Sequence, residues 1–178
     1  MSKVRVATLW LDGCSGCHMS LLDMDQRLIE LTEKIEIVFS PLIDTKQFPE
    51  NVDLTVIEGG ISSDEDLEKI KKVRANTKVL LALGDCAITG NVPAMRNTFS
   101  ISDIYQRVYV ENSDLHKDVM PCQIVPALLP KSRPVHEFVP VDAYLPGCPP
   151  PADAIFFALS ELAEGRLPEL GSLSRFGR

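Results

Sequence analysis

The amino-acid sequence predicts an α/β fold in which an open, mostly parallel sheet carries helices on both faces. Short apolar runs typical of buried strands alternate with segments whose apolar residues recur at helical spacing. Their order along the chain is strand, helix, strand, strand, helix, strand, as expected when crossover helices join parallel strands. The 178 residues, of which 45% are hydrophobic, suffice for one globular domain with a sizeable core.

The first half of the chain supplies most of the predicted sheet. Residues 3–11 form the first strand, because alternating polar and apolar residues give way to a nearly all-apolar stretch. Residues 21–31 carry apolar side chains at helical spacing, and we expect one helix of about four turns there. Strands are then predicted at 35–39 and 53–57, since both are apolar runs bounded by turn residues.

A second helix is predicted to follow Ser62. Ser62 and Glu65 have the spacing of a capping box, and the charges that follow change from acidic to basic, as a helix dipole prefers. Residues 78–83 form the most continuous apolar strand of the chain. The last regular element is a helix that begins at residue 152 behind three prolines, which suit a first helical turn.

Residues 1–178 are expected to form a single domain in three parts. These are a regular α/β core at about 3–90, a loop-rich region at about 91–150 and a C-terminal helix at about 151–164. The middle part is punctuated by prolines and lacks periodicity, and residues 104–110 within it fit either a short helix or a strand. Long irregular loops in compact domains are more often functional than filler, so we expect this region to meet a partner.

Charge and composition exclude several classes of function. The 18 basic and 25 acidic residues give a net charge of −7, which disfavours nucleic acid and anionic lipid as partners. The N-terminus has no twin arginine and no long apolar stretch, so we expect a cytoplasmic protein without a membrane span. Disulfides are rare in that reducing compartment, and the five cysteines therefore point to metal binding or redox chemistry.

Four of these cysteines lie where predicted strands end. Cys14 and Cys17 occupy the turn between the first strand and the first helix, Cys86 follows another strand by three residues, and Cys148 directly precedes the prolines of the last helix. Loops at the carboxyl ends of parallel strands meet at one edge of a sheet, so the four thiols can converge there. Four cysteine thiolates are the usual ligands of a cubane iron–sulfur cluster, and glycines beside them let backbone amides approach the sulfides.

Other interpretations of the cysteines stay open at this point. Zinc also binds four cysteines, although structural zinc sites usually pair two short Cys-x-x-Cys units and here the third and fourth thiols are solitary. A thioredoxin-like redox pair of Cys14 and Cys17 would suit a helix N-terminus, but it leaves Cys86 and Cys148 without a role. Cys122 lies outside any such setting, and we interpret it as a small buried residue.

Taken together, four motifs resemble the small subunits of nickel–iron hydrogenases in order and spacing. The resemblance extends from about Val4 to Leu162 and implies a flavodoxin-like fold. It also implies that one 4Fe-4S cluster is bound by Cys14, Cys17, Cys86 and Cys148. The motifs are residues 13–18 (GCSGCH), 58–59 (EG), 84–87 (GDCA) and 146–150 (PGCPP).

Within that family the chain looks most like the small subunit of the cytoplasmic, bidirectional NAD-linked hydrogenases. The twin-arginine signal and the C-terminal region with additional clusters, found in periplasmic members, are absent from this sequence. The related subunit of respiratory complex I has adjacent tandem cysteines, whereas two residues separate Cys14 from Cys17 here.

The resemblance implies an electron-transfer subunit of hydrogen dehydrogenase, with no catalytic residue in this chain. Hydrogen would be converted at the nickel–iron centre of a large partner subunit, and electrons would pass between that site and a diaphorase module that reduces or oxidises NAD(H). Flavin and further clusters would belong to the diaphorase subunits. Ferredoxin or a deazaflavin is the alternative acceptor, and a zinc- or thiol-stabilised binding module is the alternative class of protein.

Two further residues are candidates for the cluster environment. Glu58, at a strand end on the cluster side, is expected to hydrogen-bond near the cluster or to assist proton or redox coupling; an ordinary solvated turn acid is the alternative. His18 adjoins Cys17 and is a candidate donor to a sulfide, with a surface or interface residue as the alternative. Cysteines occupy the turn that would hold a flavin phosphate, so we expect no flavin on this chain.

Overall fold

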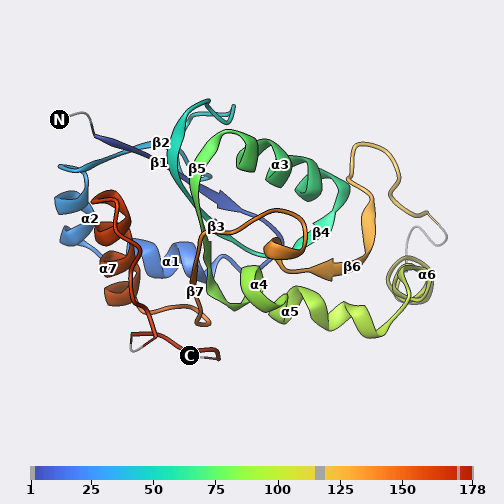
Figure 1. The fold of residues 1–178 in the computed structure, drawn as a ribbon. Coiled ribbons are helices and arrows are strands. Elements are labelled where there is room, and N and C mark those ends of the chain that lie inside the picture. The colour runs from blue at the N-terminus through green and yellow to red at the C-terminus, as the bar shows by residue number, and fades with distance from the viewer. Residues whose placement is uncertain (1–2, 115–118, 172, 178) are drawn as a thin grey trace.

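The computed structural model describes residues 3–114, 119–171 and 173–177 and is built around a five-stranded sheet with helices on both faces (Figure 1). The strands lie in the order β2-β1-β3-β5-β7, and every neighbouring pair is parallel. This is the flavodoxin-like order, and the predicted fold class is confirmed. The strands are β1 (Val4–Trp10), β2 (Ile35–Phe39), β3 (Val52–Glu58), β5 (Thr77–Leu83) and β7 (Ala143–Leu145).

One face of the sheet is covered by the helices near the two ends of the chain (Figure 1). Their apolar side chains form a single core cluster with the inward residues of the strands, among them Val6, Val56 and Leu83. Each large apolar side chain buried in this way contributes about 1.5–3 kcal/mol. The helices are α1 (Gly16–Leu22), α2 (Gln26–Leu31) and α7 (Ala152–Ala163).

The other face is covered by elements from the middle of the chain. Ile70 and Val73 of α3 pack against Leu9, Ile57 and Leu80 of the strands in a second core cluster. The central strands β3 and β5 therefore have apolar residues on both sides, which is why they appear in the sequence as continuous apolar runs. The covering elements are α3 (Asp64–Ala75), α4 (Gly84–Thr89) and the short 3₁₀ helix η3 (Val135–Glu137).

The single helix predicted over residues 21–31 is two helices, so that prediction was wrong. Asp25, just before α2, has a φ of 51°, which few residues other than glycine adopt and which interrupts the helical hydrogen bonds. Leu21, Met24 and Leu31 are nevertheless all buried in the same core cluster. The apolar residues therefore keep their helical spacing across the break between α1 and α2, so the sequence pattern does not show where the helix is interrupted.

A small second sheet, which the sequence pattern did not predict, precedes α3. In it β4 (Ile61–Ser63) pairs antiparallel with β6 (Leu128–Arg133). The capping box was also misplaced. Ser63 Oγ accepts a hydrogen bond from Asp66 N at 3.1 Å, and the Asp66 carboxylate accepts from Ser63 N at 3.0 Å, so the box is one residue later than the predicted pair of Ser62 and Glu65.

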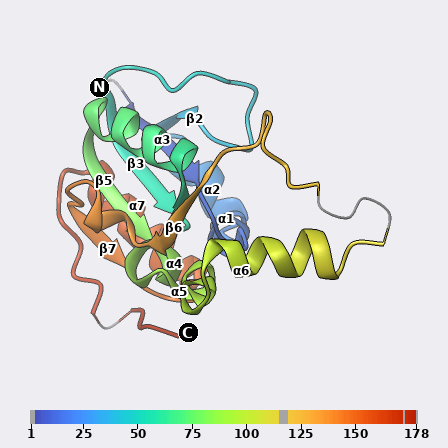
Figure 2. The same cartoon turned by 90° about the vertical axis from the view of Figure 1, so that its right-hand side faces the viewer.

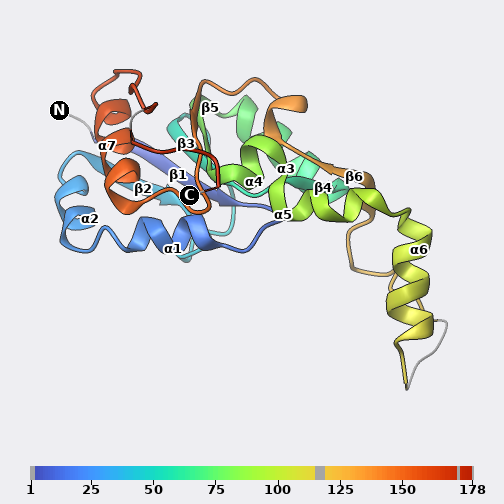
Figure 3. The same cartoon turned by 90° about the horizontal axis from the view of Figure 1, so that it is seen from below.

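Much of the proline-punctuated region is helical. Residues 104–110, predicted as a helix or a strand, are helical, and α6 with η2 forms a rod that projects from the body (Figures 2 and 3). Nowhere in the described ranges is there a helix long and apolar enough to cross a bilayer. The elements are α5 (Asn91–Ala94), η1 (Met95–Thr98), α6 (Ile101–Tyr105) and η2 (Gln106–Glu111).

The position of the capping box can be tested by unfolding. Ser63→Ala removes the side-chain acceptor at the N-terminus of α3, and we expect it to lower the free energy of unfolding by about 1 kcal/mol. Glu65 is exposed and, among the described residues, forms an ion pair only with Lys69 one turn away, so Glu65→Gln should change the same quantity by less than about 0.5 kcal/mol. Urea titrations of both variants measure the difference, and a larger loss for Glu65→Gln would contradict this assignment.

Candidate metal centre

Three parallel strands direct four thiols to the same edge of the sheet. Cys14 and Cys17 follow β1, Cys86 lies in the first turn of α4 directly after β5, and Cys148 follows β7. Cys17 is close enough to Cys14, Cys86 and Cys148 for their charges to raise its pKa, so the structure brings together the four predicted ligands. Cys122 is exposed, and its interpretation as a small buried residue was wrong.

The loop that carries Cys14 and Cys17 is fixed to the end of β3. Asp12 and Gly60 exchange backbone hydrogen bonds of 3.2 and 2.7 Å in an isolated bridge. Gly59, the residue directly before Gly60, has a φ of +89°, and a Cβ atom there would lie 2.7 Å from the carbonyl carbon of Leu11. Only glycine permits this close approach, because a larger residue would push the two chain segments apart.

Cys17 and the start of α4 are in direct contact. Gly84 has a φ of +81°, and a Cβ atom at this position would lie 2.2 Å from Cys17 Sγ. The absence of a side chain at Gly84 therefore makes room for the sulfur. Cys86, in the first turn of α4, is buried, whereas Cys17 is half-buried and Cys14 and Cys148 are exposed.

Asp85 holds the loop that carries Cys148. Its backbone N–H donates to Gly147 O at 2.9 Å, and its carboxylate accepts from Gly147 N at 2.7 Å. The second carboxylate oxygen accepts from Gly177 N at 2.7 Å, which ties the C-terminal segment to the same point (Figures 1 and 3). Ser20 Oγ of α1 donates to Pro150 O at 2.6 Å. Sequence reasoning assigned Asp85 no role, and its only signal was its place beside Cys86.

Glu58 and His18 form a buried pair between β3 and α1. Glu58 Oε2 accepts a hydrogen bond from His18 N at 2.7 Å and lies 3.1 Å from His18 Nδ1, although that second contact is not aligned as a hydrogen bond. Each residue is only 2% exposed, and the ring of Trp10 lies 5.5 Å from that of His18. The alternatives of a solvated turn acid and a surface histidine were therefore wrong.

The electrostatics of the thiols disfavour a free dithiol. Burial, followed by the negative charge of Glu58, raises the pKa of Cys17 far above its usual range. Burial also raises the pKa of Cys86, against a hydrogen bond from Val92 N that lowers it. A thioredoxin-like pair needs a lowered thiol pKa, whereas thiols in this environment become thiolates when a bound metal supplies positive charge.

The chain matches, over residues 14–162, the family model described as NADH ubiquinone oxidoreductase, 20 Kd subunit. It belongs to this family. It is 42% identical to the NAD-reducing hydrogenase HoxS subunit delta of Cupriavidus necator, over 98% of this chain and 86% of that protein. It is 37% identical to a subunit of an F420-non-reducing hydrogenase from Methanocaldococcus jannaschii, over 94% of this chain but only 58% of the archaeal protein. The predicted recognition of a nickel–iron hydrogenase small subunit is confirmed.

Solved structures agree with this assignment. A chain in the crystal structure of an NAD+-reducing [NiFe]-hydrogenase in the H2-reduced state superposes with a TM-score of 0.92 at 39% identity, covering 98% of this chain and 99% of that one. A [NiFeSe] hydrogenase chain from Desulfovibrio vulgaris Hildenborough gives a TM-score of 0.62 at 19% identity, covering 92% of this chain and 60% of that one, and shows the fold alone.

The donor set fits the iron–sulfur cluster that the family implies. Four thiols converge from three loops, and the absence of a side chain at Gly84 makes room for the sulfur of Cys17. In the part of the chain that the structure describes, no three His, Cys, Asp or Glu side chains are arranged to hold a single metal ion.

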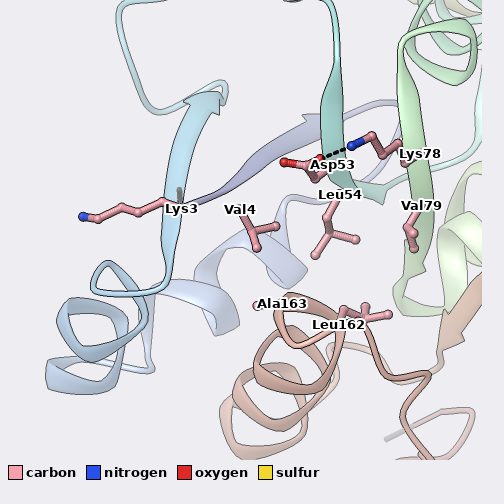
Figure 4. Close-up of a pocket in the computed structure, with 9 residues that line it drawn as sticks. Lys3, Val4, Asp53, Leu54, Lys78, Val79, Leu162 and Ala163 are labelled. Carbon is pink, nitrogen blue, oxygen red and sulfur yellow. Dashed lines mark hydrogen bonds and ion pairs between the residues drawn. The ribbon is translucent and has the colours of Figure 1, made fainter. Parts of the chain in front are cut away.

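A pocket at the opposite edge of the sheet does not contribute to this centre. It lies at the amino ends of β1, β3 and β5 beside the end of α7, and its walls include Val4, Leu54, Val79 and Leu162 (Figure 4). Two of its charged groups are already paired with each other, since Lys78 Nζ lies 2.7 Å from Asp53 Oδ1. Folds of this type bind ligands at the carboxyl ends of their strands, where the cysteines lie.

The contact between Gly84 and Cys17 predicts a large effect of one added methyl group. Gly84→Ala should displace Cys17 and cause loss of bound iron, with a destabilisation at least about 2 kcal/mol greater than that of the control. Gly165→Ala is the matched control, because Gly165 also has a positive φ, +75°, but nothing lies within 4 Å of the added Cβ. Iron content per chain and the free energy of unfolding measure both effects, and equal values for the two variants would contradict the prediction.

Proposed function

We propose that this chain is the electron-transfer subunit of an NAD+-reducing nickel–iron hydrogenase. In this proposal Cys14, Cys17, Cys86 and Cys148 hold one 4Fe-4S cluster. The chain relays electrons between the nickel–iron site of a large subunit and diaphorase subunits that carry flavin and further clusters. The observation that carries the proposal is the meeting of four thiols from three loops at one sheet edge, and the 42% identity to an NAD-reducing hydrogenase subunit supports the acceptor.

In this relay the protein contributes a binding site that is held by hydrogen bonds and partly shielded from solvent. When bound, the cluster supplies a one-electron carrier whose charge changes with each transfer. Cys17 and Cys86 keep their thiolates away from water, and the hydrogen bonds of Asp85 fix the loop of Cys148. Little of this site has to rearrange when an electron arrives, and no residue of this chain has to act on hydrogen or NAD+.

The surroundings of the thiols suit a large protein partner. Trp10, Met19, Val92 and Met95 are 41–70% exposed on β1, α1, α5 and η1, the elements next to the thiol loops. Large apolar side chains exposed beside a site are a feature of surfaces that contact other proteins. We assign this surface to the large subunit, which would cover the cluster. The net charge of −7 disfavours nucleic acid, and the cytoplasm suits a site that depends on reduced thiols.

The ligand set and the acceptor can be tested in one experiment on the hydrogenase complex purified anaerobically. Cys148→Ser should lower the iron and sulfide bound to this chain and reduce H2-dependent NAD+ reduction by at least about 100-fold. Cys122→Ser is the matched control, because Cys122 is exposed and outside the site, and both quantities should stay at the wild-type level.

Two outcomes would contradict the proposal at different points. A wild-type complex that holds zinc in this chain, with no iron or sulfide, would remove the electron-transfer function. A complex that contains iron but reduces ferredoxin or a deazaflavin with H2, and not NAD+, would keep the relay and change the acceptor. The archaeal relative is a subunit of an F420-non-reducing hydrogenase, so it lends no support to a deazaflavin acceptor.

Glu58 should lower the reduction potential of the site. Its buried carboxylate raises the pKa of Cys17 and Cys86, and the same negative charge opposes the addition of an electron to a cluster held by them. We expect Glu58→Gln to shift the equilibrium about tenfold towards the reduced form, which corresponds to about 59 mV for one electron. Redox titration followed by electron paramagnetic resonance measures the shift. Glu36→Gln, on the exposed side of β2, is the control, and an unchanged potential in Glu58→Gln would remove this role.

A further inference from the structure

The corner between α4 and α5 directs two hydrogen-bond donors at two of the thiols. Asn91 Nδ2 donates to Cys148 Sγ at 3.4 Å, and Val92 N donates to the Cys86 thiol. The two sulfurs belong to loops that follow different strands, β7 and β5. One short stretch of backbone therefore serves ligands that are 62 positions apart in the sequence.

The shape of this corner is set by two consecutive residues with positive φ. Gly90 has a φ of 87° and Asn91 a φ of 30°, and asparagine tolerates this region better than most residues. Backbone hydrogen bonds of 3.1 Å from Gly90 N to Cys86 O and from Ala94 N to Gly90 O hold the corner on either side. The backbone on both sides of Asn91 is therefore held by hydrogen bonds.

The side chain of Asn91 has no other partner that explains its presence. Asn91 is the first residue of α5, and within the described ranges its only side-chain hydrogen bond is to Cys148. Asparagine is a donor that does not titrate, so its hydrogen bond to a thiolate persists at every pH at which the protein is folded. A structural residue at the same corner would need only the backbone conformation, which glycine supplies as well.

We propose that Asn91 is a positioning residue that raises the reduction potential of the cluster by donating a hydrogen bond to the Cys148 thiolate. This inference rests on the proposed function, because it requires a cluster on the four cysteines. The amide directs the positive end of its N–H dipole at the sulfur. The reduced cluster carries one more negative charge than the oxidised one, so the hydrogen bond stabilises the reduced form more. Asn91 acts in the opposite direction to Glu58.

The test is a redox titration of the anaerobically purified hydrogenase complex, followed by electron paramagnetic resonance. Asn91→Gly removes the donor without backbone strain, and we expect the ratio of reduced to oxidised cluster at a fixed potential to fall about threefold to tenfold. Tenfold corresponds to about 59 mV for a one-electron couple. Asn91→Asp replaces the donor with a negative charge and should shift the ratio further in the same direction.

The control is Asn76→Asp, which makes the same substitution at the C-terminal end of α3, where the side chain donates to Lys72 O at 2.8 Å. It should leave the potential unchanged. An unchanged potential in an iron-containing Asn91→Gly or Asn91→Asp complex would overturn the inference, and so would loss of iron from both, because Asn91 would then be structural. A wild-type complex without a reducible cluster would instead contradict the proposed function.

Discussion

The parallel direction of the strands is the constraint on which the site depends. Because β1, β3, β5 and β7 are neighbours that run the same way, the segments that follow them open at one edge of the sheet. That edge receives Cys14 and Cys17 after β1, Glu58 at the end of β3, Cys86 after β5 and Cys148 after β7. The two core clusters hold the strands in register, so the packing of the sheet also sets the positions of the thiols.

This arrangement gathers groups whose charges repel one another. The other three cysteines raise the pKa of Cys17 together with burial and with the carboxylate of Glu58. Such a site is unfavourable when its thiols are deprotonated and empty, and it becomes favourable when a cation-rich group binds. Hydrogen-bond donors such as Val92 N offset part of the same negative charge from the protein side. A bound group that carries positive charge would therefore relieve this repulsion.

The sequence predicts the sheet and the meeting of the four cysteines better than the residues that support them. Apolar runs locate β1, β2, β3 and β5 because those strands have five to seven residues, whereas β4 and β7 have only three residues each and leave no pattern. The break at Asp25 is hidden, since the apolar residues on both sides of it enter one core cluster. The sequence does not identify Asp85 and Asn91 as site residues, because their hydrogen-bond partners, Gly147 and Cys148, lie 62 and 57 positions away.

The loop of Cys148, the fourth proposed ligand, needs the hydrogen bonds that those supporting residues supply. Cys14, Cys17 and Cys86 follow strands of seven residues, but Cys148 follows a strand of only three at the edge of the sheet. So short a strand cannot fix the loop beyond it. Asp85 of α4, Ser20 of α1 and Gly177 near the C-terminus supply the missing constraints through hydrogen bonds on or around that loop. Since these residues come from distant parts of the chain, the loop of Cys148 is held by contacts that only the folded chain brings together.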